Sequence, residues 1–160
     1  MSAIAAAGLA ATAIDVRVRR IPNALTLAIG ASGVLAALLS WSSVTPLAAL
    51  AAFAIGLLVM LPGHVVGATG AGDVKLFAAI ATWLGPRATV TAFLYTALAG
   101  GAIAVAVALR RRILSDTIAR ATTLVSSAGL NVGDIESSRI NRFAYAPAIA
   151  LGTLVAALRF

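Results

Sequence analysis

The stretch that decides the fold is residues 70–84, GAGDVKLFAAIATWL, in which an acid stands at the start of an apolar run. As a helix, the run 74–84 would span only about 16 Å at 1.5 Å per residue. The hydrocarbon core of a bilayer is about 30 Å thick. Either the membrane is locally thinned there, or the helix begins earlier and Asp73 already lies below the membrane surface. A charge inside a membrane is costly, so Asp73 is a candidate for function.

Five other apolar runs accompany this stretch, and they predict an all-α, polytopic membrane protein with six transmembrane helices. Hydrophobic residues make up 61% of the 160 residues and charged ones only 11%, against about 25% charged in soluble domains. Solid apolar runs favour helices, which satisfy their own backbone hydrogen bonds in lipid, over a barrel, whose strands alternate in polarity. The runs lie at about 1–14, 24–40, 46–62, 74–84, 88–109 and 143–158.

The basic residues set the expected orientation. With the N-terminus outside, the loops 15–23, 63–75 and 110–142 lie in the cytoplasm and hold ten of the twelve lysines and arginines. The opposite orientation would invert that ratio. We therefore expect a multi-pass protein of the bacterial inner (plasma) membrane. The net charge of +7 then indicates cytoplasmic loops and contact with anionic membrane lipid, and not nucleic-acid binding.

The chain reads as a single membrane-embedded domain, 1–160, with one cytoplasmic loop at about 110–142. It contains no cysteine, which excludes disulfides, thiolate zinc sites and a cysteine nucleophile. His64 is the only histidine, so histidine-based chemistry would have to be built on it. Nothing in the sequence specifies an oligomeric state.

Two of the five acidic residues stand apart from the polar loop. Asp15 follows the first apolar run and Asp73 precedes the fourth, so the predicted topology puts both at the cytoplasmic face. Two carboxylates that lie close together share one proton, which raises one pKa. The ionised member can then take a proton from water while its partner polarises a peptide carbonyl. Such hydrolysis needs neither a metal nor a cofactor.

Structural roles for the same acids stay open on the residues alone. Asp73 could cap the positive end of the fourth helix. Asp15 could pair with Arg19, four residues further on. A proton or ion relay is the third reading, because intramembrane acids commonly serve that purpose.

Two strings resemble those of a known family. Residues 70–76 read GxGDVKL, and residues 15–23 read D-x-R-x-R-R-I-P-N. Together, each beside an apolar run of a six-helix chain, they resemble the type IV prepilin peptidases, which are GxGD aspartic proteases. The segment 143–152 is also similar to the last helix of that family. The resemblance is strongest to the short form that serves tight-adherence (Tad/Flp) pili.

The resemblance implies a membrane aspartic endopeptidase that removes the basic leader of prepilins at the cytoplasmic face. Asp15 and Asp73 become its catalytic pair, and its partner is the leader and apolar helix of the prepilin. Longer members carry a cysteine-rich insertion and also methylate the new pilin terminus. This chain has no cysteine, so we expect no separate methyltransferase domain. The alternatives from other classes are a small proton-coupled carrier and a non-enzymatic scaffold of the secretion machinery.

Four further residues of the two strings have supporting interpretations. Gly70 and Gly72 would allow the backbone to bend and approach closely beside Asp73. Pro22 and Asn23 would start the second helix, because proline favours a first helical turn.

Lys75 and His64 are expected to lie outside the chemistry. Lys75 follows Asp73 by about 200° around a helix, so it should face elsewhere and extend toward the headgroups. His64, in a glycine-containing loop, is interpreted as incidental.

Overall fold

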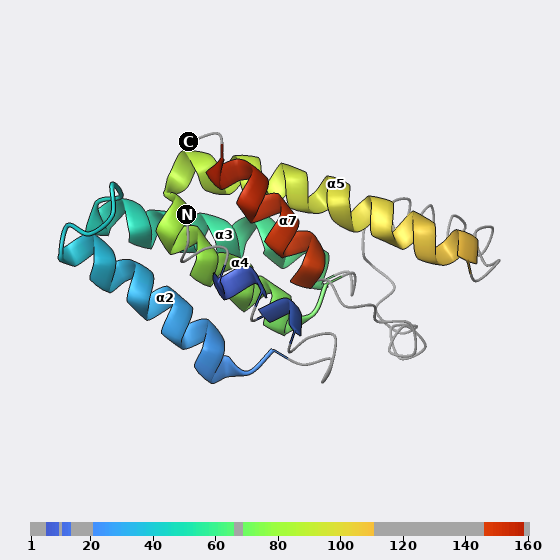
Figure 1. The fold of residues 1–160 in the computed structure, drawn as a ribbon, viewed down its shortest axis with the longest axis horizontal. Coiled ribbons are helices and arrows are strands. Elements are labelled where there is room, and N and C mark those ends of the chain that lie inside the picture. Colours follow the sequence, from blue (N-terminus) through green and yellow to red (C-terminus); the bar gives the residue numbers. More distant parts are fainter. Residues whose placement is uncertain (1–5, 10, 14–20, 66–68, 111–145, 159–160) are drawn as a thin grey trace.

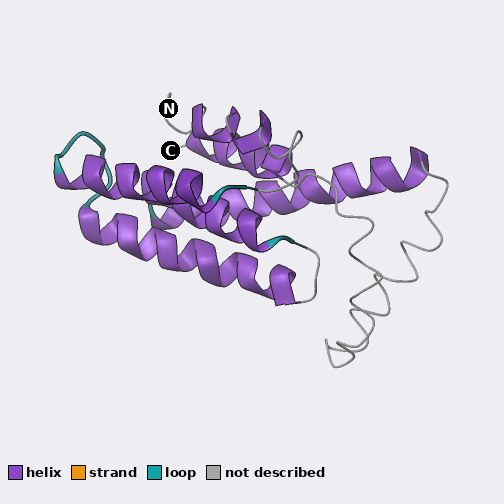
Figure 2. Cartoon of the chain, turned by 90° about the horizontal axis from the view of Figure 1, so that it is seen from below, coloured by secondary structure: helices purple, strands orange, loops and turns teal. Residues whose placement is uncertain are grey.

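The computed structural model describes residues 6–9, 11–13, 21–65, 69–110 and 146–158 (Figure 1). These residues form helices and the turns between them, without a strand, which confirms the predicted all-α class. Figure 2 shows the same arrangement from a second side. The principal helices are α2 (Asn23–Leu38), α3 (Pro46–Val65), α4 (Ala71–Leu84), α5 (Pro86–Arg110) and α7 (Ala146–Ala157).

Two of these helices are long and apolar enough to cross a membrane. They are Pro46–Val65 and Pro86–Ala106, while Asn23–Leu38 and Ala146–Ala157 are shorter apolar helices. The five principal helices follow five of the six apolar runs, and the described residues of the first run, 6–9 and 11–13, are helical as well. Six membrane crossings and an external N-terminus stay predictions, as does the polar loop, most of which lies outside the described residues.

The short helix α4 lies at the centre of the bundle. It contacts α2, α3, α5 and α7, and every residue from 76 to 82 is buried. It begins at Ala71. The helix therefore starts before the apolar run 74–84, which was one of the two possibilities that the sequence left open. A helix enclosed by other helices is hydrophobic on all sides and has no need to match the thickness of the lipid. This explains a length of 14 residues.

Small residues allow the helices around α4 to approach it closely. A Cβ on Gly56 of α3 would lie 2.9 Å from the Cα of Ala78. A Cβ on Gly33 of α2 would overlap the side chain of Thr82. Gly152 of α7 meets α5 in the same way at Thr96. Close contact through small residues is the usual means of packing helices in lipid, where apolar burial gives little driving force.

Two aromatic side chains of α4 add specific contacts to this packing. Phe77 is fully buried and meets Phe93 of α5 edge to face, with ring centroids 6.3 Å apart. Trp83 donates its indole N–H to the carbonyl of Ile29 in α2 at 3.2 Å. The central helix is therefore fixed to its neighbours by directed contacts as well as by shape.

The ends of α3 and α4 show how the sequence sets the turns. The sequence predicted a break after residue 62, yet α3 continues through Pro62 to Val65. A proline inside a helix removes one backbone hydrogen bond and crowds the carbonyl four residues earlier, and α3 ends three residues beyond it. By contrast, α4 ends at Gly85, whose φ of 79° favours glycine, and Pro86 begins α5.

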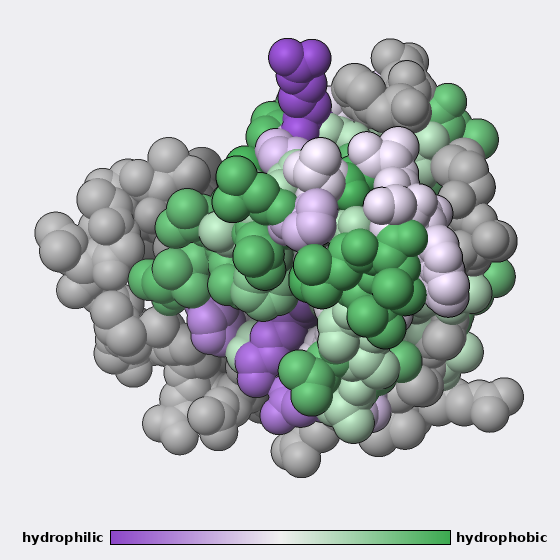
Figure 3. Space-filling view, turned by 90° about the vertical axis from the view of Figure 1, so that its left-hand side faces the viewer, coloured by the Kyte–Doolittle hydropathy of each residue, from purple (hydrophilic) through white to green (hydrophobic). Residues whose placement is uncertain are grey.

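The outer faces of the helices are strongly apolar. Leu27, Leu47 and Leu98 are between 70% and 78% exposed. Figure 3 views the end of the molecule where α2 leads into α3, and most of the described surface there is apolar. Soluble monomers rarely expose so much contiguous apolar surface. This surface fits a protein whose outer helices face lipid.

Candidate functional site

Asp73 lies in the first turn of α4 and is half-buried. Its Oδ2 accepts a hydrogen bond from the backbone N–H of Gly70 at 3.0 Å. Gly70 precedes the helix in an extended conformation, and its N–H points back at the carboxylate. A negative charge in a first turn is also favoured by the positive end of the helix. Asp73 therefore does help to cap α4, which was one of the structural roles left open. The hydrogen bond from Gly70 also fixes the position of its carboxylate.

The two glycines of the GxGD string have close neighbours. A Cβ on Gly70 would lie 3.0 Å from the Oδ2 of Asp73, and a Cβ on Gly72 would lie 3.2 Å from the Cβ of Ile21. Both distances are shorter than ordinary van der Waals contact. Both positions are closely packed against side chains, while the predicted contribution of the two glycines to the site stays a prediction. At Gly70, whose φ is −76°, the demand is steric and not one of backbone conformation.

Ile21, which meets Gly72, belongs to the string that begins at Asp15. The next two residues start α2 as predicted: Pro22 is the N-cap, with φ −63° and ψ 136°, and Asn23 is the first helical residue. The carbonyl of Pro22 accepts the first backbone bonds of the helix, from residues 25 and 26. The end of the first string is therefore ordered against the start of the second.

A side-chain hydrogen bond joins the same two strings a second time. The Nζ of Lys75 donates to the Oδ1 of Asn23 at 3.0 Å, between residues 52 positions apart in the sequence. Both side chains are exposed. Lys75 had been expected to face away from Asp73 and toward the headgroups. The structure adds a defined partner on α2.

Asp15 falls in the segment 14–20, which lies outside the described residues. Its role and its distance from Asp73 therefore stay predictions. The described ends of the two strings still limit that distance. Asp15 precedes Ile21 by six residues, a span of at most about 22 Å even when fully extended, and Ile21 contacts Gly72.

One contact beside the site was not anticipated from the sequence. The Nδ1 of His64 lies 3.1 Å from the carbonyl oxygen of Thr69, and the N–H of Thr69 donates to the carbonyl of Gly63 at 3.1 Å. Together these bonds join the last turn of α3 to Thr69, the residue before Gly70. The position of the only histidine, six residues before the GxGD string, was the available signal.

Comparison with known proteins gives one match. The model of the type IV leader peptidase family matches residues 2–105, which include both strings and the helices from α2 through most of α5. No curated protein and no solved structure matches the chain.

Proposed function

Because the chain belongs to the type IV leader peptidase family, we propose that it is a membrane aspartic endopeptidase that removes the leader of type IV prepilins. The family establishes a protease of the prepilin leader peptidase type. The proposal adds the catalytic pair Asp15 and Asp73, cleavage at the cytoplasmic face, and a substrate of the Flp type.

The assignment of Asp15 and Asp73 as a pair is supported by two contacts between the strings that contain them. Gly72 packs against Ile21, and Lys75 bonds to Asn23. These contacts hold Ile21 and Asn23, at the end of the string that begins at Asp15, beside the first turn of α4, where Asp73 accepts a hydrogen bond from the N–H of Gly70.

In the proposed mechanism the two carboxyl groups hold one proton between them. The ionised carboxylate takes a proton from a water molecule, which attacks the carbonyl carbon of the scissile peptide. The protonated carboxyl donates a hydrogen bond to the carbonyl oxygen and then passes its proton on as the amine leaves. Because the two groups titrate as a pair, the acid and base roles belong to the pair as a whole.

The cytoplasmic position is proposed from charge. The end of the bundle that carries Asn23 and Asp73 also carries Lys75, and the loops predicted on that side hold most of the basic residues. Basic loops are retained in the cytoplasm during insertion. A basic leader that stays in the cytoplasm would meet the acids on that side.

The test is cleavage of a co-expressed Flp-type prepilin by Asp15→Asn and Asp73→Asn variants. We expect each change to reduce cleavage by about 10²–10⁴-fold, the usual contribution of general acid–base groups. An asparagine at position 73 can still accept the bond from Gly70, so the helix cap is preserved while the titratable group is lost. Asp116→Asn, a change to an acid of the polar segment, is the matched control. Normal processing by either active-site variant would refute the assignment.

A further inference from the structure

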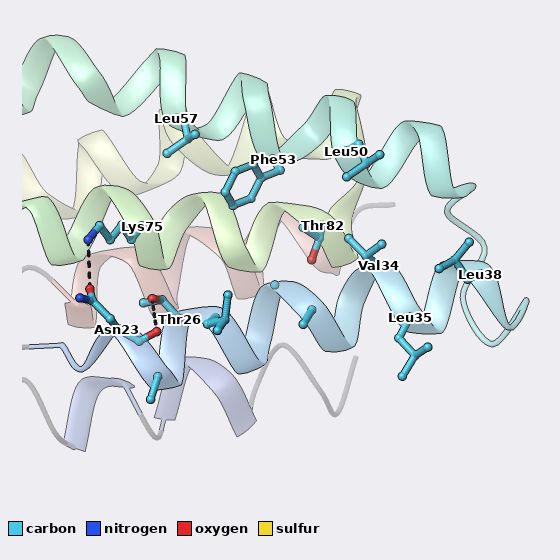
Figure 4. Close-up of a pocket in the computed structure, with 14 residues that line it drawn as sticks. Asn23, Thr26, Val34, Leu35, Leu38, Leu50, Phe53, Leu57, Lys75 and Thr82 are labelled. Atoms are coloured by element: carbon cyan, nitrogen blue, oxygen red, sulfur yellow. Dashed lines mark hydrogen bonds between the residues drawn. The ribbon is translucent and has the colours of Figure 1, made fainter.

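A long groove runs along the outer side of the bundle between α2 and α3. Its volume is about 1000 Å³. Leu50, Phe53 and Leu57 of α3 form one wall, Val34 and Leu38 lie on the opposite wall (Figure 4), and Thr82 of α4 lines its floor. We refer to it as the α2–α3 groove.

One end of the α2–α3 groove is polar. Lys75 and Asn23 line that end and are joined by their hydrogen bond (Figure 4). The ammonium of Lys75 has three N–H donors and gives one to Asn23, and the amide of Asn23 has N–H donors of its own. Asn23 also begins α2, whose positive end adds to the local potential. None of the described residues that line the groove is acidic, so this end is suited to an anion.

The shape of the groove fits a lipid molecule with a charged head and an apolar chain. From Asn23 to Leu38 the groove follows α2 for about 22 Å, at 1.5 Å per residue. That length accommodates an acyl chain that spans the ~15 Å depth of one hydrocarbon leaflet. Beyond its polar end the groove is lined mostly by apolar residues, so a cationic end leads into an apolar channel.

We propose that the α2–α3 groove binds an anionic phospholipid of the cytoplasmic leaflet. One acyl chain lies between the leucines of α2 and α3, and the phosphate accepts hydrogen bonds from Lys75 and Asn23. Polar contacts at the head and apolar contacts along the chain then act on one molecule, which selects for lipid over free phosphate. This inference goes beyond the peptidase activity and does not depend on it.

Native mass spectrometry of the delipidated full chain tests the headgroup. Phosphatidylglycerol and phosphatidylcholine with identical acyl chains are added to the protein in detergent. We expect about fivefold tighter binding of the anionic lipid, the effect of one lysine near the surface. Lys75→Gln should remove this preference, whereas Arg87→Gln, which removes an exposed charge at the far end of α4, should keep it. Equal binding of the two lipids by the wild type, or a preference that survives Lys75→Gln, would overturn the proposal.

A second variant tests the acyl chain. Ala31 lines the groove from α2 and is exposed, so Ala31→Phe fills the groove without entering the core. We expect it to reduce the binding of both lipids at unchanged melting temperature. A photoreactive phenylalanine analogue in place of Leu35, which also lines the groove, should cross-link to phospholipid. Cross-links to co-expressed prepilin instead would overturn the proposal, because the groove would then hold the apolar segment of the substrate.

Discussion

Replacing Gly72 by alanine adds one methyl group between the two strings that carry the proposed catalytic acids. The new Cβ would lie 3.2 Å from the Cβ of Ile21, where ordinary contact begins at 3.4 Å and extends to 4 Å. Relief of this contact requires a shift of a few tenths of an ångström between the start of α4 and Ile21. We therefore expect the change to alter the geometry of the site more than the stability of the fold.

The two effects have different expected sizes. Overpacking costs about 1–3 kcal/mol, but alanine is favoured over glycine in a helix by up to about 1 kcal/mol. The net loss of stability should therefore be about 0–2 kcal/mol. A misplacement of 1 Å at an active site can cost about a hundredfold in rate, so a shift of about 0.2–0.3 Å should cost roughly threefold.

Prepilin cleavage by purified protein in proteoliposomes measures the rate, and thermal unfolding in detergent measures the stability. Gly30→Ala is the matched control, because its Cβ would meet Ala79 at an ordinary 3.6 Å. We expect the control to cleave at the wild-type rate. If Gly72→Ala also cleaves at that rate, the contact with Ile21 does not position the acids, and the reasoning is refuted.

Four other experiments test the packing and the junction. Gly56→Ala, whose Cβ would lie 2.9 Å from a backbone carbon of α4, should destabilise the fold by about 1–3 kcal/mol; Gly101→Ala, which meets nothing within 4 Å, should stabilise it by up to about 1 kcal/mol. Phe77→Ala should cost about 3–5 kcal/mol in thermal unfolding, because the ring is fully buried. A double-mutant cycle between Lys75→Gln and Asn23→Ala should show a coupling of about 0.2–1 kcal/mol, the range for exposed polar pairs, and a coupling of zero would contradict the bond.

The helices were largely predictable because their signals are local. The apolar runs marked five of the described helices, and the fixed φ of Pro22 marked the start of α2. The sequence did not decide whether the membrane is thinned around the short fourth run or whether α4 begins before it. Lipid tails and buried side chains are equally apolar, so both surroundings favour the same residues. The sequence therefore does not state whether an apolar run faces lipid or other helices.

The contacts of the site were less predictable than its residues. The GxGD string named Asp73, Gly70 and Gly72 by resemblance. The position of Lys75 on the helix predicted that it faces away from Asp73. Its hydrogen-bond partner Asn23 could not be predicted, because it lies 52 residues away in the sequence. The contact between His64 and Thr69 lies between two helices. Hydrophobic periodicity predicts helices and strands but not the contacts between them.

The enclosure of α4 affects how this protein would respond to bilayers of different thickness. Hydrophobic mismatch acts on helices that contact lipid, through tilting or local deformation of the bilayer. Among the described helices, α3 and α5 are long and apolar enough to cross the membrane and to respond by tilting, whereas α4 is packed against other helices. The depth of Asp73 is thus set by interhelical contacts, and a thicker or thinner membrane should tilt the outer helices before it displaces the acid.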